Sequence, residues 1–490
     1  MILTASTLPA SKRSPLACPE RSLRKALFTG KQKLSLYLVL LVLSSSPLAF
    51  GQSAPKTEFI PYQSAKPIVE AMGDSLPQEL KAAGNLDATK WSAWVQSRDQ
   101  EIRDRLDRGE EDTLTKLLRF GVTYTKEYRI DDDYLVRYGN SSLVNAFAQS
   151  RADDLVRALA ASNPPAGLAE MKSFLLNKGF SFNTPQQRAV VKKYLLDNLA
   201  RLRDEFLKYR AQPKDEKRFQ LFQDRGISLD TNLWPDYQLD AAFREMVSQG
   251  LLKPGSIRRV AIIGPGLDFV NKESGNDFYP PQTIQPFAVL DSLFQLGLAD
   301  PATVELFTFD ISPSVNAHVE RIRKNALQGT PYIVQLPWNT QRPMSDEYRH
   351  AFVAYWEKLG NQIGAPVPAI SVPAGATGTS TRAVKIRAQV VQRIASPVDM
   401  NIVYQRLTLP PEQAFDLLIG TNIFLYYGNF EQELARANAA SMLRPGGFLL
   451  SNGKLPDTVA SGLKDVLDAP ITSSVNPLIT DTIFCYQRVK

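Results

Sequence analysis

The chain has few of the residues that support disulfide, metal or histidine chemistry. Its 490 residues include two cysteines, Cys18 and Cys485, and two histidines, His318 and His350. A disulfide framework is excluded, because a chain processed after its leading segment would keep one cysteine. Histidine-centred triads and zinc sites are not supported, since we expect His318 on the surface of a helix and His350 in a charged segment. We therefore expect no metal site.

A long hydrophobic run is also missing. The uncharged apolar run 34–43 is short for a membrane span, which needs about 20 residues. Basic residues precede it, and Ala49 and Gly51 fit the small-residue pattern before a cut near Gln52. Residues 1–51 are thus predicted to be a cleaved export signal, with an uncleaved membrane anchor or a misassigned start codon as alternatives. Export or anchoring would place the body in the periplasm or outside the cell, and a misassigned start in the cytoplasm.

The body of the chain lacks an excess of either charge. Seven basic residues and one acidic residue in the first 51 positions supply six of the seven formal positive charges. The near balance of the rest gives no support for electrostatic capture of DNA or RNA. We expect no nucleic-acid partner, and membrane contact only through the N-terminal segment.

Residues 57–250 are predicted to form an all-helical N-terminal domain. Apolar residues recur at helical spacing in ATKWSAWVQSRDQEIRDRL, with Asp87 as its N-cap, and in the segment 184–210. The acidic run Asp131–Asp133 is interpreted as a solvated turn rather than a calcium loop, because no further acidic ligand follows at the required spacing. We find no chemistry-bearing motif in this half.

Residues 256–490 have a different texture, with short apolar runs alternating with helical segments. RRVAIIG and VELFTFD are strand-like, and TIQPFAVLDSLFQLGL is helix-like. Such alternation is typical of an α/β fold whose mostly parallel sheet is covered by helices on both faces. Ligands of these sheets bind at the carboxyl ends of the strands.

The first strand runs into Gly264-Pro265-Gly266, where two residues without side chains allow a sharp turn and a close approach to a ligand. A dinucleotide-binding turn would have a third glycine at position 269, which is Phe269. This departure disfavours a nicotinamide-linked oxidoreductase. No Gly-Lys-Ser/Thr follows, so a phosphate-binding P-loop is excluded.

Asp310 ends the second predicted strand. A carboxylate at this place suits two adjacent ribose hydroxyls, each of which donates a hydrogen bond to it. The alternative is that Asp310 caps the helix that follows. The glycine turn in the same half favours the ribose interpretation.

The segment 415–453, FDLLIGTNIFLYYGNFEQELARANAASMLRPGGFLLSNG, completes the pattern. With the glycine turn and Asp310, it resembles the class I S-adenosylmethionine-dependent methyltransferases, and FDLLIGTNIFLYY is similar to the fourth strand of chemotaxis-receptor methyltransferases. The resemblance implies a Rossmann-like methyltransferase sheet with a closing antiparallel hairpin, in which DTIFCYQRV is the last strand.

The resemblance also implies S-adenosylmethionine as cofactor and places its binding residues. These are Gly264, Pro265, Gly266, Asp268, Asp310, Ile311 and Thr421. It places Asn422, Tyr426 and Tyr427 near the methyl acceptor, with helix packing as the alternative for the tyrosines.

Three positions depart from the family pattern. Ile262 and Asp268 replace an acidic residue and a third glycine, and Gln405-Arg406-Leu407 stands where an adenine-contacting acid is expected after the third strand.

Two insertions interrupt the predicted sheet. The first, LDFVNKESGNDFYPPQTIQ, is expected to form a lid or substrate wall. Its candidate contacts are Asp268, Asn276, Asp277, Tyr279 and Gln282. The second spans about 331–398 and includes PAGATGTSTR, which we expect to be a mobile loop.

Two functions remain open from the sequence. The first is an S-adenosylmethionine-dependent methyltransferase-like enzyme whose acceptor is an unidentified small molecule or protein. Such an enzyme mainly positions donor and acceptor and removes a proton. The alternative is an exported, non-catalytic binding or structural protein that retains the fold, because this cofactor is not expected outside the cytosol.

Overall fold

The computed structural model describes most of the chain after the leader. The described residues are 56–82, 84–138, 141–210, 226–227, 233–267, 277–341, 343–456, 461–472 and 480–489. The predicted leader 1–51, Asp268 and Asn276 lie outside them. No helix within these ranges is long and apolar enough to cross a membrane.

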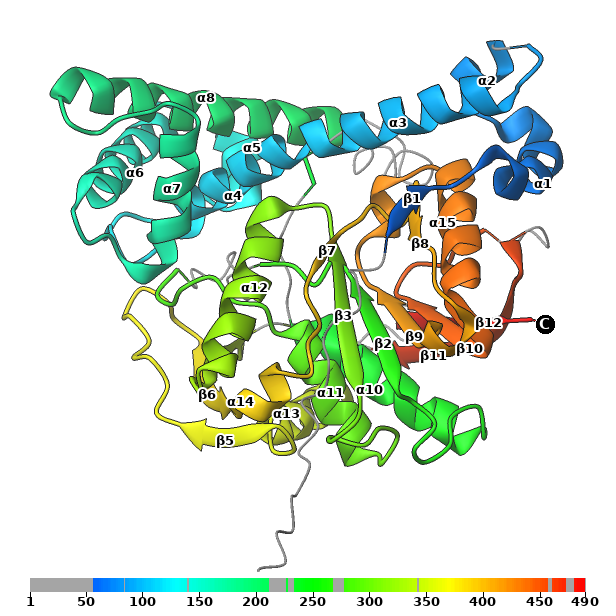
Figure 1. Ribbon diagram of the computed structural model, residues 1–490. Coiled ribbons are helices and arrows are strands. Elements are labelled where there is room, and N and C mark those ends of the chain that lie inside the picture. The colour runs from blue at the N-terminus through cyan, green and yellow to red at the C-terminus, as the bar shows by residue number, and fades with distance from the viewer. Residues whose placement is uncertain are drawn as a thin grey trace, which may run out of the picture. The chain divides into compact units, whose positions relative to one another are not determined.

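A seven-stranded sheet forms the centre of the second half, with strand order β11-β12-β10-β9-β2-β3-β7 (Figure 1). Its strands are β2 (Arg259–Ile263), β3 (Glu305–Asp310), β7 (Val398–Asp399), β9 (Phe415–Gly420), β10 (Leu443–Ser451), β11 (Leu463–Thr472) and β12 (Thr480–Arg488). β2, β3, β7, β9 and β10 pair in parallel, whereas β12 is antiparallel to both β10 and β11. The mostly parallel sheet and its closing antiparallel hairpin are thus confirmed.

The central strand β2 is apolar because both faces of the sheet are covered. Successive side chains of a strand point to opposite faces. Val260 and Ile262 accordingly enter one hydrophobic core, and Ala261 and Ile263 enter the other.

Helices supply a large part of these two cores. They are α10 (Leu233–Ser248), α11 (Gln285–Gln295), α12 (Pro313–Leu327), α13 (Asp346–Lys358) and α14 (Ala388–Val391) on the first core, and α1 (Tyr62–Met72), α3 (Ala88–Asp104) and α15 (Asn429–Met442) on the second. Each face of the sheet therefore has its own helical layer, as the alternation of strand-like and helix-like segments in the sequence predicts.

The order of the strands reverses beside β2. The chain runs from β2 outward to β3 and β7, then returns to place β9 and β10 on the other side of β2. In open sheets, the crevice at the carboxyl ends of the strands at such a switch point is the usual ligand site. A ligand site is therefore expected at the carboxyl ends of β2, β3, β7 and β9.

The N-terminal region consists mainly of helices. They are α1 (Tyr62–Met72), α2 (Gln78–Ala82), α3 (Ala88–Asp104), α4 (Leu106–Phe120), α5 (Asp132–Tyr138), α6 (Ser142–Ala160), α7 (Ala169–Asn177) and α8 (Pro185–Arg210). The Asp87 side chain accepts hydrogen bonds from the N–H groups of Thr89 and Lys90, both at 2.9 Å, which confirms the predicted N-cap. Asp131 likewise accepts from Tyr134 N–H and opens α5, so the acidic run is an exposed helix start.

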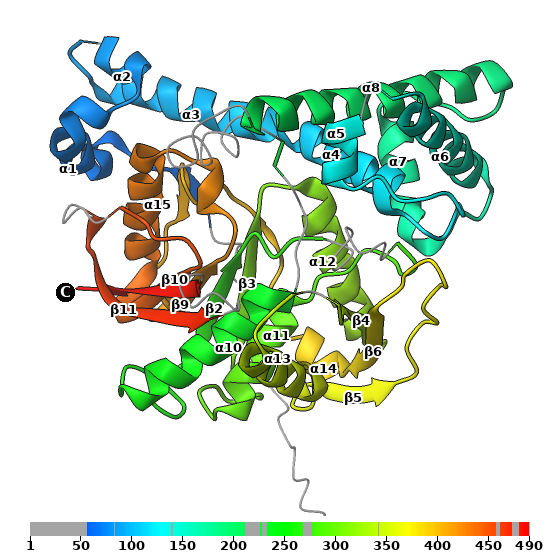
Figure 2. The same cartoon turned by 180° about the vertical axis from the view of Figure 1, so that it is seen from behind.

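An all-helical N-terminal domain is not confirmed. Strand β1 (Thr57–Phe59) pairs antiparallel with β8 (Gln405–Leu407) of the second half. Helix α3 lies beside β1, as both views show (Figures 1 and 2). Both halves belong to one compact unit, Ala54–Lys490. The domain boundaries at 57–250 and 256–490 stay a prediction.

The second insertion forms a small sheet of its own. Strands β4 (Tyr332–Asn339), β6 (Thr379–Ile386) and β5 (Gly364–Val367) pair antiparallel in the order β4-β6-β5. The last four residues of PAGATGTSTR belong to β6, so the expectation of a loop was wrong for Thr379–Arg382. The cause is the long pairing with β4, which satisfies the backbone groups of β6.

The same sheet corrects the placement of His318. This side chain is 6% exposed, and its Nε2 lies 3.0 Å from the hydroxyl of Tyr332 in β4. Burial lowers the pKa of His318 to about 4. The prediction of a surface position was wrong, because β4 from the insertion covers this side of α12. His350 is exposed on α13.

Candidate functional site

The glycine turn after β2 adopts a backbone that favours glycine. Gly264 has φ 64° and Gly266 has φ 73°, both in the left-handed region. The Gly264 N–H donates to the carbonyl of Phe309 in β3 at 2.7 Å. A Cβ at position 264 would lie 2.1 Å from Cδ1 of Ile423, so a side chain would also displace a neighbour.

Asp310 stands at the tip of β3 beside this turn. Its side chain is 7% exposed, and its Oδ1 accepts a hydrogen bond from Ser312 N–H at 2.8 Å. Burial raises the pKa of Asp310 to about 7, although N–H donors, including that of Gly266, oppose the shift. The N-cap of α12 is Ser312, whose hydroxyl accepts from Val315 N–H. The alternative that Asp310 caps this helix is therefore wrong.

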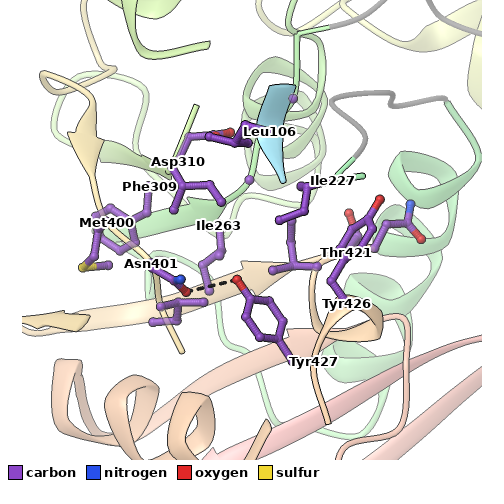
Figure 3. Close-up of a pocket in the computed structure, with 16 residues that line it drawn as sticks. Leu106, Ile227, Ile263, Phe309, Asp310, Met400, Asn401, Thr421, Tyr426 and Tyr427 are labelled. Carbon is purple, nitrogen blue, oxygen red and sulfur yellow. Dashed lines mark hydrogen bonds between the residues drawn. The ribbon is translucent and has the colours of Figure 1, made fainter. Parts of the chain in front are cut away.

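A cavity lies at the carboxyl ends of β2, β3, β7 and β9. It encloses about 780 Å³ of space free of protein atoms, part of it open to solvent. Figure 3 shows Asp310 and Thr421 on its wall, together with Asn401 and Tyr427. The predicted site residues on this wall are Gly264, Gly266, Asp310, Ile311, Thr421, Asn422, Tyr426 and Tyr427. Pro265 lies between the two glycines but is not part of the wall.

The third strand is where the sequence interpretation went wrong. It is the two-residue strand β7, and it is followed by Met400, Asn401 and Ile402, which line the cavity. Residues 405–407, expected at this place, form β8 outside the large sheet. A two-residue strand offers no apolar run, so no periodic signal marked it.

Asn401 joins the cavity to helix α3. Its Nδ2 donates to Oδ1 of the buried Asp99 at 2.8 Å, and its Oδ1 accepts from the Tyr427 hydroxyl at 3.2 Å (Figure 3). Arg103 of the same helix pairs with Asp399 at 2.7 Å. The loop after β7 is thus held by a helix about 300 residues earlier in the chain.

Two further residues of the N-terminal region complete the wall. They are Leu106 and Ile227, both labelled in Figure 3. The Ile227 N–H donates to the Arg105 carbonyl at 3.2 Å, next to the start of α4. A Cβ at Gly109 would lie 1.7 Å from the Ile227 carbonyl oxygen. Only glycine at position 109 therefore lets the backbone of Ile227 pack this closely against α4. No motif in the sequence indicated that these residues reach the site.

Thr421 follows β9 and belongs to a chain of buried polar groups. Its Oγ1 accepts from Nε2 of Gln285 at 2.9 Å, and the same Nε2 lies 3.2 Å from Oδ1 of Asp236. Because Oγ1 accepts from Gln285, its own proton is available to another acceptor. Burial raises the pKa of Asp236 to about 7.

Asn422 takes a conformation that is unusual for a residue with a side chain. Its φ is 59°, in the left-handed region that asparagine tolerates better than most residues. Its N–H donates to Oδ1 of Asn452 at 2.8 Å, and Nδ2 of Asn452 donates back to its Oδ1 at 2.8 Å. Such local strain is concentrated at functional sites.

The expected substrate contacts of the first insertion lie away from the cavity. Asp277, 1% exposed, accepts from the N–H groups of Val122 and Thr123 at 2.9 and 3.1 Å. Gln282 exchanges hydrogen bonds with the backbone of Gln335 in β4, and Tyr279 is fully buried in the helical core. These three residues anchor other elements, and none of them lines the cavity.

Comparisons with known proteins give fold-level likenesses only. No protein-family profile matches the chain, and no curated protein matches it significantly. The N-methyltransferase NodS from Bradyrhizobium japonicum WM9 is 10% identical at a TM-score of 0.24, with 52% of this chain and 98% of that chain covered. The glycopeptide N-methyltransferase MtfA is 12% identical at a TM-score of 0.24, covering 51% and 96%.

Magnesium protoporphyrin IX methyltransferase (ChlM) from Synechocystis PCC 6803, solved with bound S-adenosylmethionine, is 12% identical at a TM-score of 0.22, covering 59% and 96%. Identities and TM-scores this low establish no activity for this chain. The similarity to chemotaxis-receptor methyltransferases stays a prediction.

Proposed function

We propose that the chain binds S-adenosylmethionine in this cavity and is a methyltransferase-like protein. The observation that carries the proposal is the meeting of the glycine turn and buried Asp310 at the switch point of the sheet. A fold alone does not determine an activity, whereas these side chains and this cavity are specific to a ligand.

The residues present fit an adenosyl group. Gly264 and Gly266 leave room for close approach to the backbone, and Asp310 offers a buried carboxylate that accepts from adjacent ribose hydroxyls. Ile311 and Ile402 supply apolar surface for a flat heterocycle, and Asn401 supplies an amide at the same wall. The cavity thus combines an apolar lining with a few polar groups, as small-molecule sites do.

When bound, S-adenosylmethionine supplies a methyl group on a positively charged sulfonium. The residues of this chain would orient the acceptor and exclude water. Leu106 and Ile227 line the cavity with apolar surface, and Thr421 and Asn422 add polar groups to its wall. We propose Asn422 and Tyr426 as the residues nearest the acceptor.

Calorimetry with the full chain tests this function. S-adenosylmethionine and S-adenosylhomocysteine should both release heat on binding, and Asp310→Ala should abolish it while its circular dichroism spectrum stays unchanged. Asp346→Ala, an exposed position at the start of α13, is the matched control and should bind as the parent does. No heat at millimolar ligand would contradict the proposal.

A non-catalytic binding protein with the same fold is the second candidate. The predicted export signal favours it, as does Ile262, a fully buried core residue where the family has an acid. In this case the protein would act outside the cytosol, where S-adenosylmethionine is not expected. Cofactor binding by the parent chain would argue against this candidate.

A further inference from the structure

A second cavity adjoins the first at Asn422. It encloses about 800 Å³, part of it open to solvent, and lies between α10, β12 and the residues that follow β10. Gln238 comes from α10, Asn452 and Lys454 follow β10, and Asp481 belongs to β12. Asn422 lines both cavities, so the two lie next to each other.

Gln238 indicates that this cavity takes a polar ligand. Its side chain is 5% exposed and lines the cavity, yet its amide has no hydrogen-bond partner among the described residues. By contrast, the similarly buried Gln282 and Gln285 have amide partners at 2.7 and 2.9 Å. The amide faces the cavity, where it can both donate and accept hydrogen bonds. A ligand group in the cavity would pair with it.

The charges around the cavity favour a cation. Lys454 Nζ lies 3.5 Å from Asp465 and 3.3 Å from Asp468, so its charge is already offset by two carboxylates. Asp481 on the wall has no ion-pair partner among the described residues. Lys454 and Asp481 are the charged residues on the wall, and because Asp465 and Asp468 outside the wall offset Lys454, Asp481 is the charge left to attract a cation. The Phe484 ring already lies 5.5 Å from Lys454 Nζ, which shows that its face accepts an ammonium group.

We propose that the second cavity binds a small cationic amine, which is the methyl acceptor. This inference rests on the proposed function and names its substrate class. Asp481 pairs with an ammonium group, and the Gln238 amide accepts from an N–H or O–H of the ligand. For transfer, the reacting nitrogen first gives a proton to water. Its lone pair then forms the N–C bond as the methyl–sulfur bond breaks, leaving a neutral thioether.

Three four-carbon probes that differ in charge test the inference. Putrescine is a dication, butane-1,4-diol is neutral and succinate is a dianion. Binding to the full chain is measured by calorimetry or ligand-observed NMR, with and without S-adenosylhomocysteine. Putrescine should bind at least tenfold more tightly than the diol, and succinate should not bind. Equal binding of the three probes, or tighter binding of succinate, would overturn the inference.

Two variants test the residues named. Asp481→Asn and Gln238→Leu should each weaken putrescine binding at least tenfold and leave S-adenosylhomocysteine binding unchanged. Gln249→Leu is the control for Gln238→Leu, because Gln249 lies on the exposed side just after α10 and bonds Glu245 there. Putrescine binding that neither variant weakens would contradict the proposed site.

The two proposals fail in different ways. If S-adenosylhomocysteine binds and putrescine does not, the amine inference is wrong and the proposed cofactor site stands. If putrescine binds in a manner sensitive to Asp481→Asn but no adenosyl ligand binds, the amine site stands as a binding site only, and its role as methyl acceptor fails with the proposed function.

Discussion

Asp310 is a buried carboxylate whose ionised form is disfavoured in the absence of a ligand. Its pKa of about 7 lies above the value of about 3.9 for an exposed aspartate. The folded state therefore holds a proton that the unfolded state has lost between these values. Its contribution to folding stability is fully present below about pH 4 and is lost as the pH rises through about 7.

Asp310→Asn should remove the part of the pH-dependent loss of folding stability that Asp310 causes. Urea unfolding at pH 5 and pH 8 should show that the parent loses more stability between the two than the variant does. Part of the remaining loss of stability comes from Asp236, because burial raises the pKa of this residue to about 7 as well. Adding Asp236→Asn to the Asp310→Asn variant should therefore reduce the pH dependence of stability further. Identical pH dependence of parent and Asp310→Asn would contradict a buried, protonated Asp310.

Gly264 is needed for its backbone conformation and for its contact with Ile423. Gly264→Ala should cost the roughly 1 kcal/mol of a left-handed alanine and in addition displace Ile423 from the cavity wall. Gly255→Ala is the matched control, because Gly255 has φ 67° and nothing lies within 4 Å of its added Cβ. Thermal unfolding should rank Gly264→Ala as the less stable variant, and only this variant should weaken cofactor binding. Equal effects would show that the contact with Ile423 is unimportant.

At the scale of elements, the loop after β7 depends on helix α3. Asn401→Ala would leave Asp99, which is 5% exposed, and the Tyr427 hydroxyl without this partner. The free energy of unfolding should fall by about 1–3 kcal/mol, measured by chemical denaturation. The exposed Asn163→Ala should change it little. A loss no larger than that of the control would mean that α3 does not hold the site.

Elements with long apolar runs were predictable, and those without were not. RRVAIIG, VELFTFD and FDLLIG each form a buried strand, and the two predicted cofactor motifs meet because parallel strands end at the same edge. β7 was missed because it has two residues and owes its place to pairing with β3. β6 was missed because its first residues are polar and its partner β4 lies far earlier in the chain, where Asn339 pairs with Thr379 and Tyr332 pairs with Ile386.

The N-terminal wall of the cavity was beyond sequence reasoning for another reason. Leu106 and Ile227 are ordinary apolar residues, and their role follows from where α4 begins and from the Gly109 contact. Asp277 is the opposite case, because its sequence context predicted a functional role that the structure does not show. A polar residue in a polar insertion was expected to contact substrate, but the folded chain uses its carboxylate to hold the backbone of Val122 and Thr123.

For the whole molecule, the two halves build one site. Tertiary hydrogen bonds join α3 to the loop after β7, and Asp277 joins the first insertion to the end of α4. A chain beginning after α8 would lack Leu106, Asp99 and Arg103, so we do not expect the second half alone to bind the cofactor as the whole chain does.

Placement in the cell is the remaining property of the whole chain. We predict that residues 1–51 direct export. Alkaline phosphatase, which is active only after export, should be active when fused to the C-terminus of the full chain and inactive when fused to residues 52–490. Full activity of a cytosolic reporter on the full chain, with an inactive phosphatase, would contradict export and remove the main reason for a non-catalytic role.

The central claim is that an adenosyl ligand occupies the cavity between Gly264, Asp310 and Thr421. A crystal structure of the full chain with S-adenosylhomocysteine measures this directly. We predict that its two ribose hydroxyls lie within hydrogen-bond distance of the Asp310 carboxylate and that the adenosyl group contacts the glycine turn. Ligand density elsewhere, or an empty cavity at saturating ligand, would contradict the account.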